Sequence, residues 1–212
     1  MKAVKQLLLA NRAWATELTD ENPDYFSRQV AGQRPQFLWI GCSDSRVAPE
    51  QMTQAQPGGM YIHRNVGNLV QADDLNLMAV IQYAVEELEV PNIVLCGHHG
   101  CAGIRAAIDD DPVGGAMGRW LEHARAVRHA HADELDAVPE AQRVDRLVEM
   151  NVRDQLLHLA ATDTVRAAFA SGRELTLHGM VYDLRDGLLK PLLEIDRTTV
   201  IDEVGRPETV LN

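Results

Sequence analysis

Apolar residues recur along the chain at two spacings, and each spacing predicts a different kind of element. Short, almost wholly apolar runs such as Gln36–Cys42 are typical of strands buried on both faces. Apolar positions three or four residues apart, bounded by a cap or a proline, are typical of amphipathic helices. Strands are predicted at 36–42, 60–63, 92–97, 174–182 and 188–195. Helices are predicted at 2–19, 23–31, 74–89, from near Cys101 onward, 117–130 and 139–170.

Strands and helices alternate along most of the chain, which predicts an α/β fold. Its central β-sheet is expected to be mostly parallel and flanked by helices, after a helical N-terminal arm. The last two strands are joined by an Asp186-Gly187 turn and are expected to add an antiparallel edge. Residues 109–118 predict a loop and no linker divides the chain, so residues 1–212 are expected to form a single domain.

The composition and charge of the chain exclude several classes of protein. Its 212 residues are 46% hydrophobic and 24% charged, which is typical of globular domains and not of disordered chains or coiled-coil rods. The net charge of −11 opposes a phosphate backbone, so no nucleic-acid partner is expected. No apolar run approaches the roughly 20 residues of a membrane span, so no membrane partner is expected either. Asn11 and Arg12 interrupt the apolar N-terminus before it reaches the length of a secretory signal.

The three cysteines of the chain need an explanation other than disulfide bonds. An odd count without a secretory signal predicts reduced thiols in a cytoplasmic protein. Cys96 lies in the middle of a predicted strand and is expected to be a small buried apolar side chain. Cys42 and Cys101 lie close to the ends of predicted strands, where α/β sheets bind ligands near a switch in strand order.

Cys42, His98 and Cys101 have the chemistry of a zinc site. The His-x-x-Cys spacing lets one strand-to-helix turn present two side chains to a single ion, and Cys42 comes from the end of another strand. Two thiolates and an imidazole suit the tetrahedral preference of zinc, and three protein ligands leave a position for water, as in catalytic sites. The alternative is that both cysteines are buried apolar side chains and that His98 is a hydrogen-bonded core histidine.

Asp44 and Arg46 closely follow the first of these cysteines. A carboxylate and a guanidinium two residues apart can form a bidentate pair. Asp44 is then placed to orient a zinc-bound hydroxide or to occupy the fourth zinc position itself. The alternative is an Asx turn or a helix cap at Asp44, with Arg46 in solvent.

These residues fall in two motifs, Cys42-Ser-Asp44-Ser-Arg46 and Gly97-His98-His-Gly-Cys101. The pair resembles the signature of the β-class carbonic anhydrases, and the likeness extends over most of the chain, including residues 63–68 and 178–183. The resemblance implies that the two cysteines and His98 hold one zinc ion per chain, with the Asp44–Arg46 pair beside it. It also implies the reversible hydration of CO2 to bicarbonate and a proton through zinc-bound hydroxide.

The expected ligand set has a consequence for the pH dependence of this reaction. Two thiolates offset the charge of zinc, so its bound water should be a weaker acid than in an all-histidine site, and activity should favour alkaline pH. The proton must then pass to buffer, and His63, His99 or another surface histidine could carry it. The sequence does not select among them.

A subset of this family is regulated by bicarbonate, and the chain resembles that subset at Trp39, Arg64 and Tyr182. The resemblance implies that these residues bind a non-catalytic bicarbonate that favours a closed state, in which Asp44 replaces water on zinc. An indole N–H, a guanidinium and a phenol are convergent donors for a small planar anion. This switch predicts a sharp loss of activity below mildly alkaline pH, and inhibition by bicarbonate. Taken singly, the two aromatic residues could instead be core residues, and Arg64 the partner of an acidic group.

Other functions and assemblies remain compatible with the same residues. The resemblance also allows hydrolysis of carbonyl sulfide or carbon disulfide on the same site, or a non-catalytic zinc- or bicarbonate-sensing module in which Asp44 is a permanent ligand. It implies a homodimer or homotetramer in which residues 1–34 form a dimerisation arm. The sequence itself shows an amphipathic segment around Val4, Leu7, Leu8 and Trp14.

Overall fold

The computed structural model describes residues 2–109 and 113–211, and the chain forms two compact units, Met1–Arg34 and Pro35–Asn212. The first unit contains helix α1 (Lys2–Glu21) and a short 3-10 helix, η1 (Ser27–Ala31). The helix predicted at 23–31 is present only over Ser27–Ala31, and as a 3-10 helix; residues 23–26 form turns.

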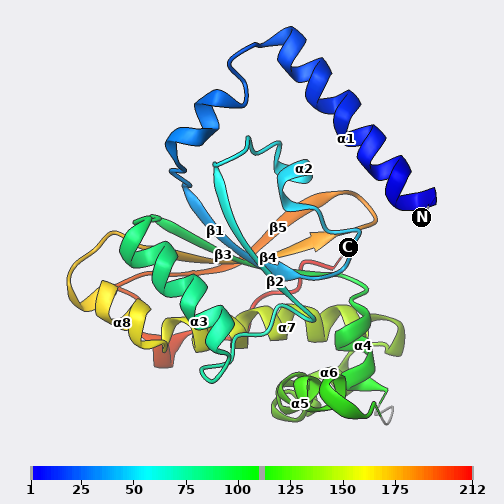
Figure 1. The fold of residues 1–212 in the computed structure, drawn as a ribbon. Helices are drawn as coiled ribbons and strands as arrows, with labels where there is room; N and C mark the ends of the chain where they lie inside the picture. Colours follow the sequence, from blue (N-terminus) through cyan, green and yellow to red (C-terminus); the bar gives the residue numbers. More distant parts are fainter. Residues whose placement is uncertain (1, 110–112, 212) are drawn as a thin grey trace. The chain divides into compact units, whose positions relative to one another are not determined.

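The second unit is built on a five-stranded sheet (Figure 1). Its strands are β1 (Phe37–Cys42), β2 (Met60–Asn65), β3 (Asn92–His98), β4 (Thr176–Asp183) and β5 (Leu188–Ile195). They lie in the order β2-β1-β3-β4-β5. The first four are parallel and β5 pairs antiparallel with β4, which confirms the expected α/β fold with an antiparallel edge. The turn between β4 and β5 needs Gly187, whose φ is +74°.

Helices connect and flank these strands. They are α2 (Pro49–Thr53), α3 (Leu75–Gln82), α4 (Ala102–Ile108), α5 (Gly115–Ala130), α6 (Ala132–Ala137), α7 (Glu140–Ala160) and α8 (Asp163–Ala170). A π-helical turn, η2 (Tyr83–Glu87), follows α3, and a 3-10 turn, η3 (Ile201–Glu203), follows β5. Among the described residues, no helix has both the length and the apolar character needed to cross a membrane.

Two helix predictions need correction. The helix predicted at 139–170 is two helices, because the backbone of Thr162 is extended. The Thr162 hydroxyl donates to the carbonyl of Leu159, which in a continuous helix would accept from the main-chain N–H four residues later. The loop predicted at 109–118 ends earlier, because α5 begins at Gly115; residues 110–112 lie outside the described residues. Gly118 lies within α5 and is required by close packing, since a Cβ there would lie 1.9 Å from the carbonyl oxygen of Val113.

The sheet is packed on both faces. One face carries the main core, which includes buried residues of α3, α4, α5, α7 and α8, and Figure 1 shows α7 lying along the sheet on this side. The other face carries a smaller cluster around Trp39, Val94 and Cys96. Burial on both faces explains the almost wholly apolar sequence of β1.

The order of the strands creates a switch point. From β1 the chain moves to β2 on one side, and then crosses to β3 on the other side of β1. Ligands of open α/β sheets bind outside the carboxyl ends of strands at such a point. Cys42 ends β1 and His98 ends β3, so the expected ligand residues lie there.

Candidate metal centre

The structure brings Cys42, His98 and Cys101 together at the carboxyl ends of β1 and β3. Their donor atoms all lie within 4.8 Å of one another. In the part of the chain that the structure describes, these three residues form the group of His, Cys, Asp or Glu side chains that is close enough to hold a metal ion. The two sulfurs are 3.8 Å apart. Two sulfurs bound at about 2.3 Å in tetrahedral geometry lie about 3.8 Å apart, so the spacing fits zinc.

The orientation of His98 also fits a metal ligand. Its Nδ1 lies 3.2 Å from the main-chain oxygen of His99, which places the ring proton on Nδ1 and leaves the lone pair on Nε2. The side chain is fully buried, yet Nε2 has no hydrogen-bond partner. A buried acceptor without a partner is costly, and a cation between Nε2 and the two sulfurs removes that cost.

The pKa values of the two thiols are shifted by their contact with each other. The hydrogen bond with Cys101 lowers the pKa of Cys42 most, and contacts from His98 and from the main-chain N–H groups of Gly67 and Asp44 lower it further, to about 4, although burial opposes them. The same contact with Cys42, followed by burial, raises the pKa of Cys101. The pair therefore holds one proton in the absence of metal, and metal binding must displace it.

Asp44 and Arg46 form the bidentate pair that the sequence suggested. Arg46 Nε donates to Asp44 Oδ1 at 3.0 Å, and Nη2 donates to Oδ2 at 2.7 Å. The main-chain N–H of Arg46 also donates to Oδ1 at 2.9 Å, so the Asx turn considered as the alternative is present as well. The hydrogen bonds from Arg46 hold the pKa of Asp44 well below its usual range, against the effect of burial, so the carboxylate stays ionised.

Asp44 lies beside the metal ligands but outside their set. Its Oδ2 is 3.8 Å from His98 Nε2, and the carboxylate does not satisfy the 4.8 Å limit with both sulfurs. Since Arg46 engages both carboxylate oxygens, Asp44 is held as a neighbour of the cluster in this structure.

Trp39, Arg64 and Tyr182 lie on one face of the sheet. Gly41 pairs with both Arg64 and Cys96, so these residues lie on the same face as Trp39, two residues before Gly41. Tyr182 pairs with His98, two residues after Cys96, and so lies on this face as well. It is the face of the smaller cluster. Trp39 and Tyr182 pack in that cluster. Among the described residues, no carboxylate pairs with Arg64; its guanidinium donates to the main-chain oxygens of Cys42 and Asp44, at 2.8 and 2.5 Å.

The indole nitrogen of Trp39 stands out within this cluster. Trp39 is 1% exposed, and its Nε1 is a buried donor with no hydrogen-bond partner. A Cβ built on Gly41 would lie 2.4 Å from this nitrogen, so the indole N–H points along the strand toward Gly41, the residue that pairs with Arg64. The donor is therefore directed toward the carboxyl end of β1, where Cys42 lies.

Neither histidine considered as a proton carrier faces solvent. His63 is 7% exposed and His99 is 3% exposed. Burial lowers the pKa of His63, and His99 is enclosed by Asp183 and Glu149, with its Nδ1 3.2 Å from Asp183 Oδ2. The described structure thus supplies no reason to prefer either residue as the proton carrier.

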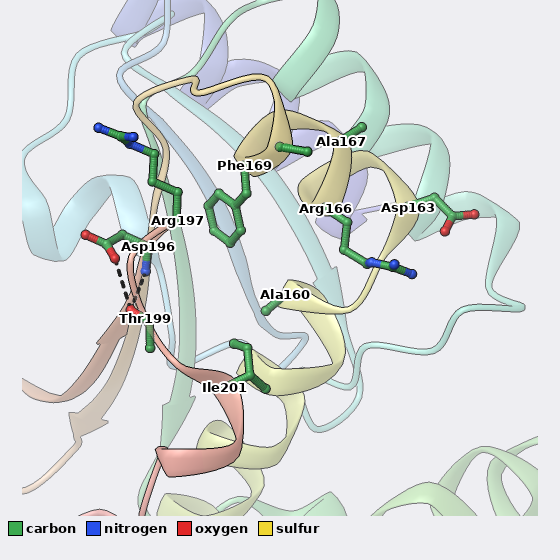
Figure 2. A pocket seen from close by; sticks show the side chains of 10 residues that line it. Ala160, Asp163, Arg166, Ala167, Phe169, Asp196, Arg197, Thr199 and Ile201 are labelled. Carbon is green, nitrogen blue, oxygen red and sulfur yellow. Dashed lines mark hydrogen bonds between the residues drawn. The ribbon is translucent and has the colours of Figure 1, made fainter.

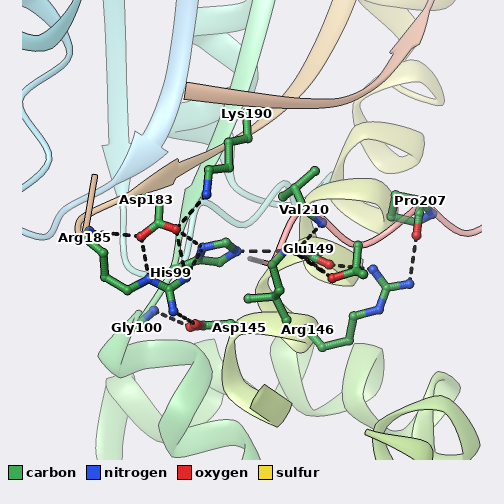
Figure 3. Close-up of polar contacts among 12 residues, drawn as sticks. His99, Gly100, Asp145, Arg146, Glu149, Asp183, Arg185, Lys190, Pro207 and Val210 are labelled. Carbon is green, nitrogen blue, oxygen red and sulfur yellow. Dashed lines mark hydrogen bonds and ion pairs between the residues drawn. The ribbon is translucent and has the colours of Figure 1, made fainter. Parts of the chain in front are cut away.

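The sequence analysis missed a row of buried polar residues on α7. Asp145 accepts from the main-chain N–H of Gly100 at 2.7 Å, beside the metal ligands, and Glu149 faces His99 (Figure 3). Two residues after Glu149, Asn151 donates to the carbonyl of Gly67 at 3.0 Å. Polar residues between the apolar positions of α7 were the available signal, but a polar residue near a core stripe does not identify its partner.

A hollow of about 530 Å³ lies elsewhere, between α8 and the segment after β5 (Figure 2). Phe169 points into it, and Arg166 and Arg197 line its rim. Because Ile195, at the end of β5, pairs with Leu177 near the start of β4, the hollow lies at the end of the sheet opposite the metal ligands. Its lining within the described chain has neither histidine nor cysteine, so it offers none of the chemistry described above.

Known proteins resemble the chain in sequence and in fold. Residues 37–189 match the family model described as carbonic anhydrase. A carbonic anhydrase of Emericella nidulans is 40% identical over 198 residues, which cover 93% of this chain and 86% of the relative. A carbonic anhydrase of Pseudomonas aeruginosa is 39% identical over 180 residues, covering 79% of this chain and 77% of the relative.

Solved structures agree with these matches. A tetrameric β-carbonic anhydrase of Sordaria macrospora superposes with a TM-score of 0.88 at 40% identity, covering 92% of this chain and 100% of that one. The Coccomyxa β-carbonic anhydrase in complex with acetazolamide gives a TM-score of 0.86 at 38% identity, covering 90% and 87%. With the Cys-His-Cys cluster at the switch point of the same fold, the chain belongs to the β-class carbonic anhydrases, the lyases that hydrate CO2.

Proposed function

We propose that Cys42, His98 and Cys101 hold one zinc ion per chain and that Asp44 and Arg46 are the catalytic pair beside it. The observation that carries this proposal is the buried Nε2 of His98, which has no protein partner and faces two sulfurs 3.8 Å apart. Bound zinc lowers the pKa of water so that hydroxide becomes available to attack CO2. Because two thiolates offset its charge, this activity is expected to favour alkaline pH.

Asp44 orients the attacking oxygen in this proposal. Its carboxylate is ionised and can only accept hydrogen bonds, so an O–H group next to His98 donates to Oδ2, which lies 3.8 Å from Nε2. Arg46 fixes the direction of that acceptor by binding both carboxylate oxygens. An oriented O–H leaves its lone pair directed away from Asp44, toward the space where CO2 enters.

Stopped-flow hydration of CO2 from pH 6.5 to 9.5, on protein of measured zinc content, tests this function. Activity that rises toward alkaline pH and is proportional to the zinc content supports it. Carbonyl sulfide and carbon disulfide serve as competing substrates in the same assay. Faster turnover of either than of CO2 would replace the proposed substrate, and full zinc content without turnover at alkaline pH would indicate a non-catalytic module.

We further propose that Trp39, Arg64 and Tyr182 bind a regulatory bicarbonate, as in the bicarbonate-regulated subset of the family. The N–H of Trp39, which is buried and has no hydrogen-bond partner among the described residues, supports this role. Arg64 also supplies a link to the active site, because its Nη2 donates to the main-chain oxygen of Asp44. An anion that draws Arg64 away releases this oxygen and lets Asp44 move toward the metal.

The assembly and location of the protein remain proposals of the same kind. We propose a homodimer or homotetramer in which residues 1–34 form the dimerisation arm, and a cytoplasmic location. Val4, Leu7 and Leu8 of α1 are each more than 60% exposed in the single chain, which supports an apolar face for a partner. A tetrameric relative from Sordaria macrospora gives further support. A monomer in light scattering at micromolar concentration would overturn this assembly.

A further inference from the structure

A buried polar network connects the C-terminal segment, residues 204–211, to the loop that carries His98 and Cys101 (Figure 3). The C-terminal segment is attached to α7 by its main chain. Arg146 Nη2 donates to the carbonyl of Pro207 at 2.8 Å, and the N–H of Val210 donates to Glu149 Oε1 at 3.0 Å. Arg153 Nη2 also donates to the carbonyl of Val204 at 2.6 Å.

Glu149 is the centre of this network. Its side chain is fully buried, so each oxygen needs a partner inside the protein. Arg146 Nη1 donates to Oε2 at 2.5 Å. Oε1 accepts from Val210 and lies 3.5 Å from His99 Nε2, the distance of an ion pair. The C-terminal segment therefore supplies the main-chain donor that fixes the oxygen facing His99.

His99 transmits this position to the metal ligands. Its ring lies between Glu149 and Asp183, and its main-chain N–H donates to the carbonyl of Tyr182 at 3.0 Å. Its main-chain oxygen accepts from His98 Nδ1 at 3.2 Å, which is the contact that directs His98 Nε2 toward the two sulfurs. A shift of the His99 ring thus displaces the acceptor that orients the zinc ligand.

We infer that the C-terminal segment is a positioning element for the zinc-binding loop and that Glu149 is the positioning residue through which it acts. This inference rests on the proposed zinc ligation by Cys42, His98 and Cys101. Partners that orient a ligating histidine typically contribute 10- to 100-fold to metal affinity. Because Glu149 acts on His98 through His99, we expect its contribution to zinc affinity to be at the lower end of this range, about tenfold.

Replacement of the Val210 N–H tests the inference. Val210→Pro removes the donor, whereas Val210→Ala keeps it and shortens the same side chain. Val210→Pro is expected to weaken zinc binding about tenfold relative to Val210→Ala, measured by chelator competition, with unchanged far-ultraviolet circular dichroism. The visible spectrum of the cobalt-substituted protein should shift in the proline variant alone. Equal zinc affinities and spectra in the two folded variants would overturn the inference.

Wild-type protein provides a second test that does not depend on whether the proline variant folds. Coupling between two sites is reciprocal, so zinc loading should slow hydrogen exchange of the Val210 amide by a similar factor of about ten. The amide of Thr198 is the matched control, because it also donates to a carboxylate, Asp196 Oδ1 at 2.9 Å, but lies outside the network. Slowing of Val210 alone supports the inference, and equal responses of the two amides would overturn it. Absence of zinc binding to the wild-type protein would instead refute the proposed ligation.

Discussion

The guanidinium of Arg64 lies 2.5 Å from the main-chain oxygen of Asp44. The same group donates to the carbonyl of Cys42 at 2.8 Å, so one side chain holds the main chain on both sides of Ser43. This contact connects the proposed bicarbonate site to the residue that the proposed switch must move. In the proposed switch, the state of the active site depends on whether Arg64 binds these main-chain oxygens or an anion.

Replacement of Arg64 tests this connection. In Arg64→Ala we expect bicarbonate inhibition to disappear, because the guanidinium that the anion would draw away is absent. The contact that holds the main-chain oxygen of Asp44 is lost as well, so activity toward neutral pH should be low whether or not bicarbonate is added. Arg64→Lys keeps the charge but not the planar fork that reaches two carbonyls, so an intermediate response is expected. Stopped-flow assays with and without bicarbonate measure both effects. An unchanged pH profile and unchanged bicarbonate sensitivity in Arg64→Ala would contradict the proposed switch.

Gly41→Ala tests the position of the Trp39 indole. The added methyl group would lie 2.4 Å from Nε1, so the indole must move, at a cost of about 1–3 kcal/mol in the free energy of unfolding. Bicarbonate inhibition should weaken at the same time, because the indole N–H, the proposed donor to the anion, is displaced. Gly114→Ala is the control, since an added Cβ there meets no atom within 4 Å. Bicarbonate inhibition that is as strong in Gly41→Ala as in the control would exclude Trp39 as a donor to the anion.

Asp183→Asn tests the buried end of the network around His99. Hydrogen bonds from Arg185, followed by those from Lys190, hold the pKa of Asp183 well below its usual range, against burial. The substitution should cost about 2 kcal/mol at pH 7, less than for a fully buried pair because Arg185 is largely exposed. A depressed pKa stabilises the fold above the unfolded value of about 3.9, and this contribution is lost as the pH falls through the lower folded value.

Urea unfolding of the wild type and Asp183→Asn between pH 7 and pH 3 measures this difference. The stability of the wild type should approach that of the variant only below about pH 4. Asp186→Asn provides a control, because it removes a nearby carboxylate that contacts the same Lys190 at 3.1 Å from a more exposed position. A difference between wild type and Asp183→Asn that stays constant down to pH 3 would show that ionisation of Asp183 does not stabilise the fold.

Elements with local signals were predictable from the sequence. The apolar run of β1 and the Asp186-Gly187 turn have local causes, burial on both faces and a positive φ, and both were predicted. Cys42, His98 and Cys101 were predictable because zinc chemistry restricts the side chains and the switch point of the sheet restricts their place. The break at Thr162 was not, since a threonine inside a helical pattern gives only a weak sign of an interruption.

The contacts around the metal centre depend on residues far apart in the chain. Glu149 meets Val210 across a sequence separation of 61 residues, and His99 meets Asp183 across 84. Neither contact has a spacing rule. The first depends on how the C-terminal segment packs on α7, and the second on the pairing of β3 with β4. The hydrogen bonds from Arg64 to two main-chain carbonyls could not be predicted either, since every residue has a main-chain oxygen and the sequence does not show which of them accepts.

Zinc content combined with CO2 hydration in two cysteine variants tests the central claim most directly. Cys101→Ser removes a proposed ligand, whereas Cys96→Ala alters an equally buried thiol outside the ligand set. The wild type and Cys96→Ala are expected to hold one zinc ion per chain and to hydrate CO2, and Cys101→Ser to lose at least nine-tenths of both, on the order of the affinity that one thiolate ligand contributes. Full zinc content and activity in Cys101→Ser, or CO2 hydration by wild-type protein free of zinc, would contradict the account.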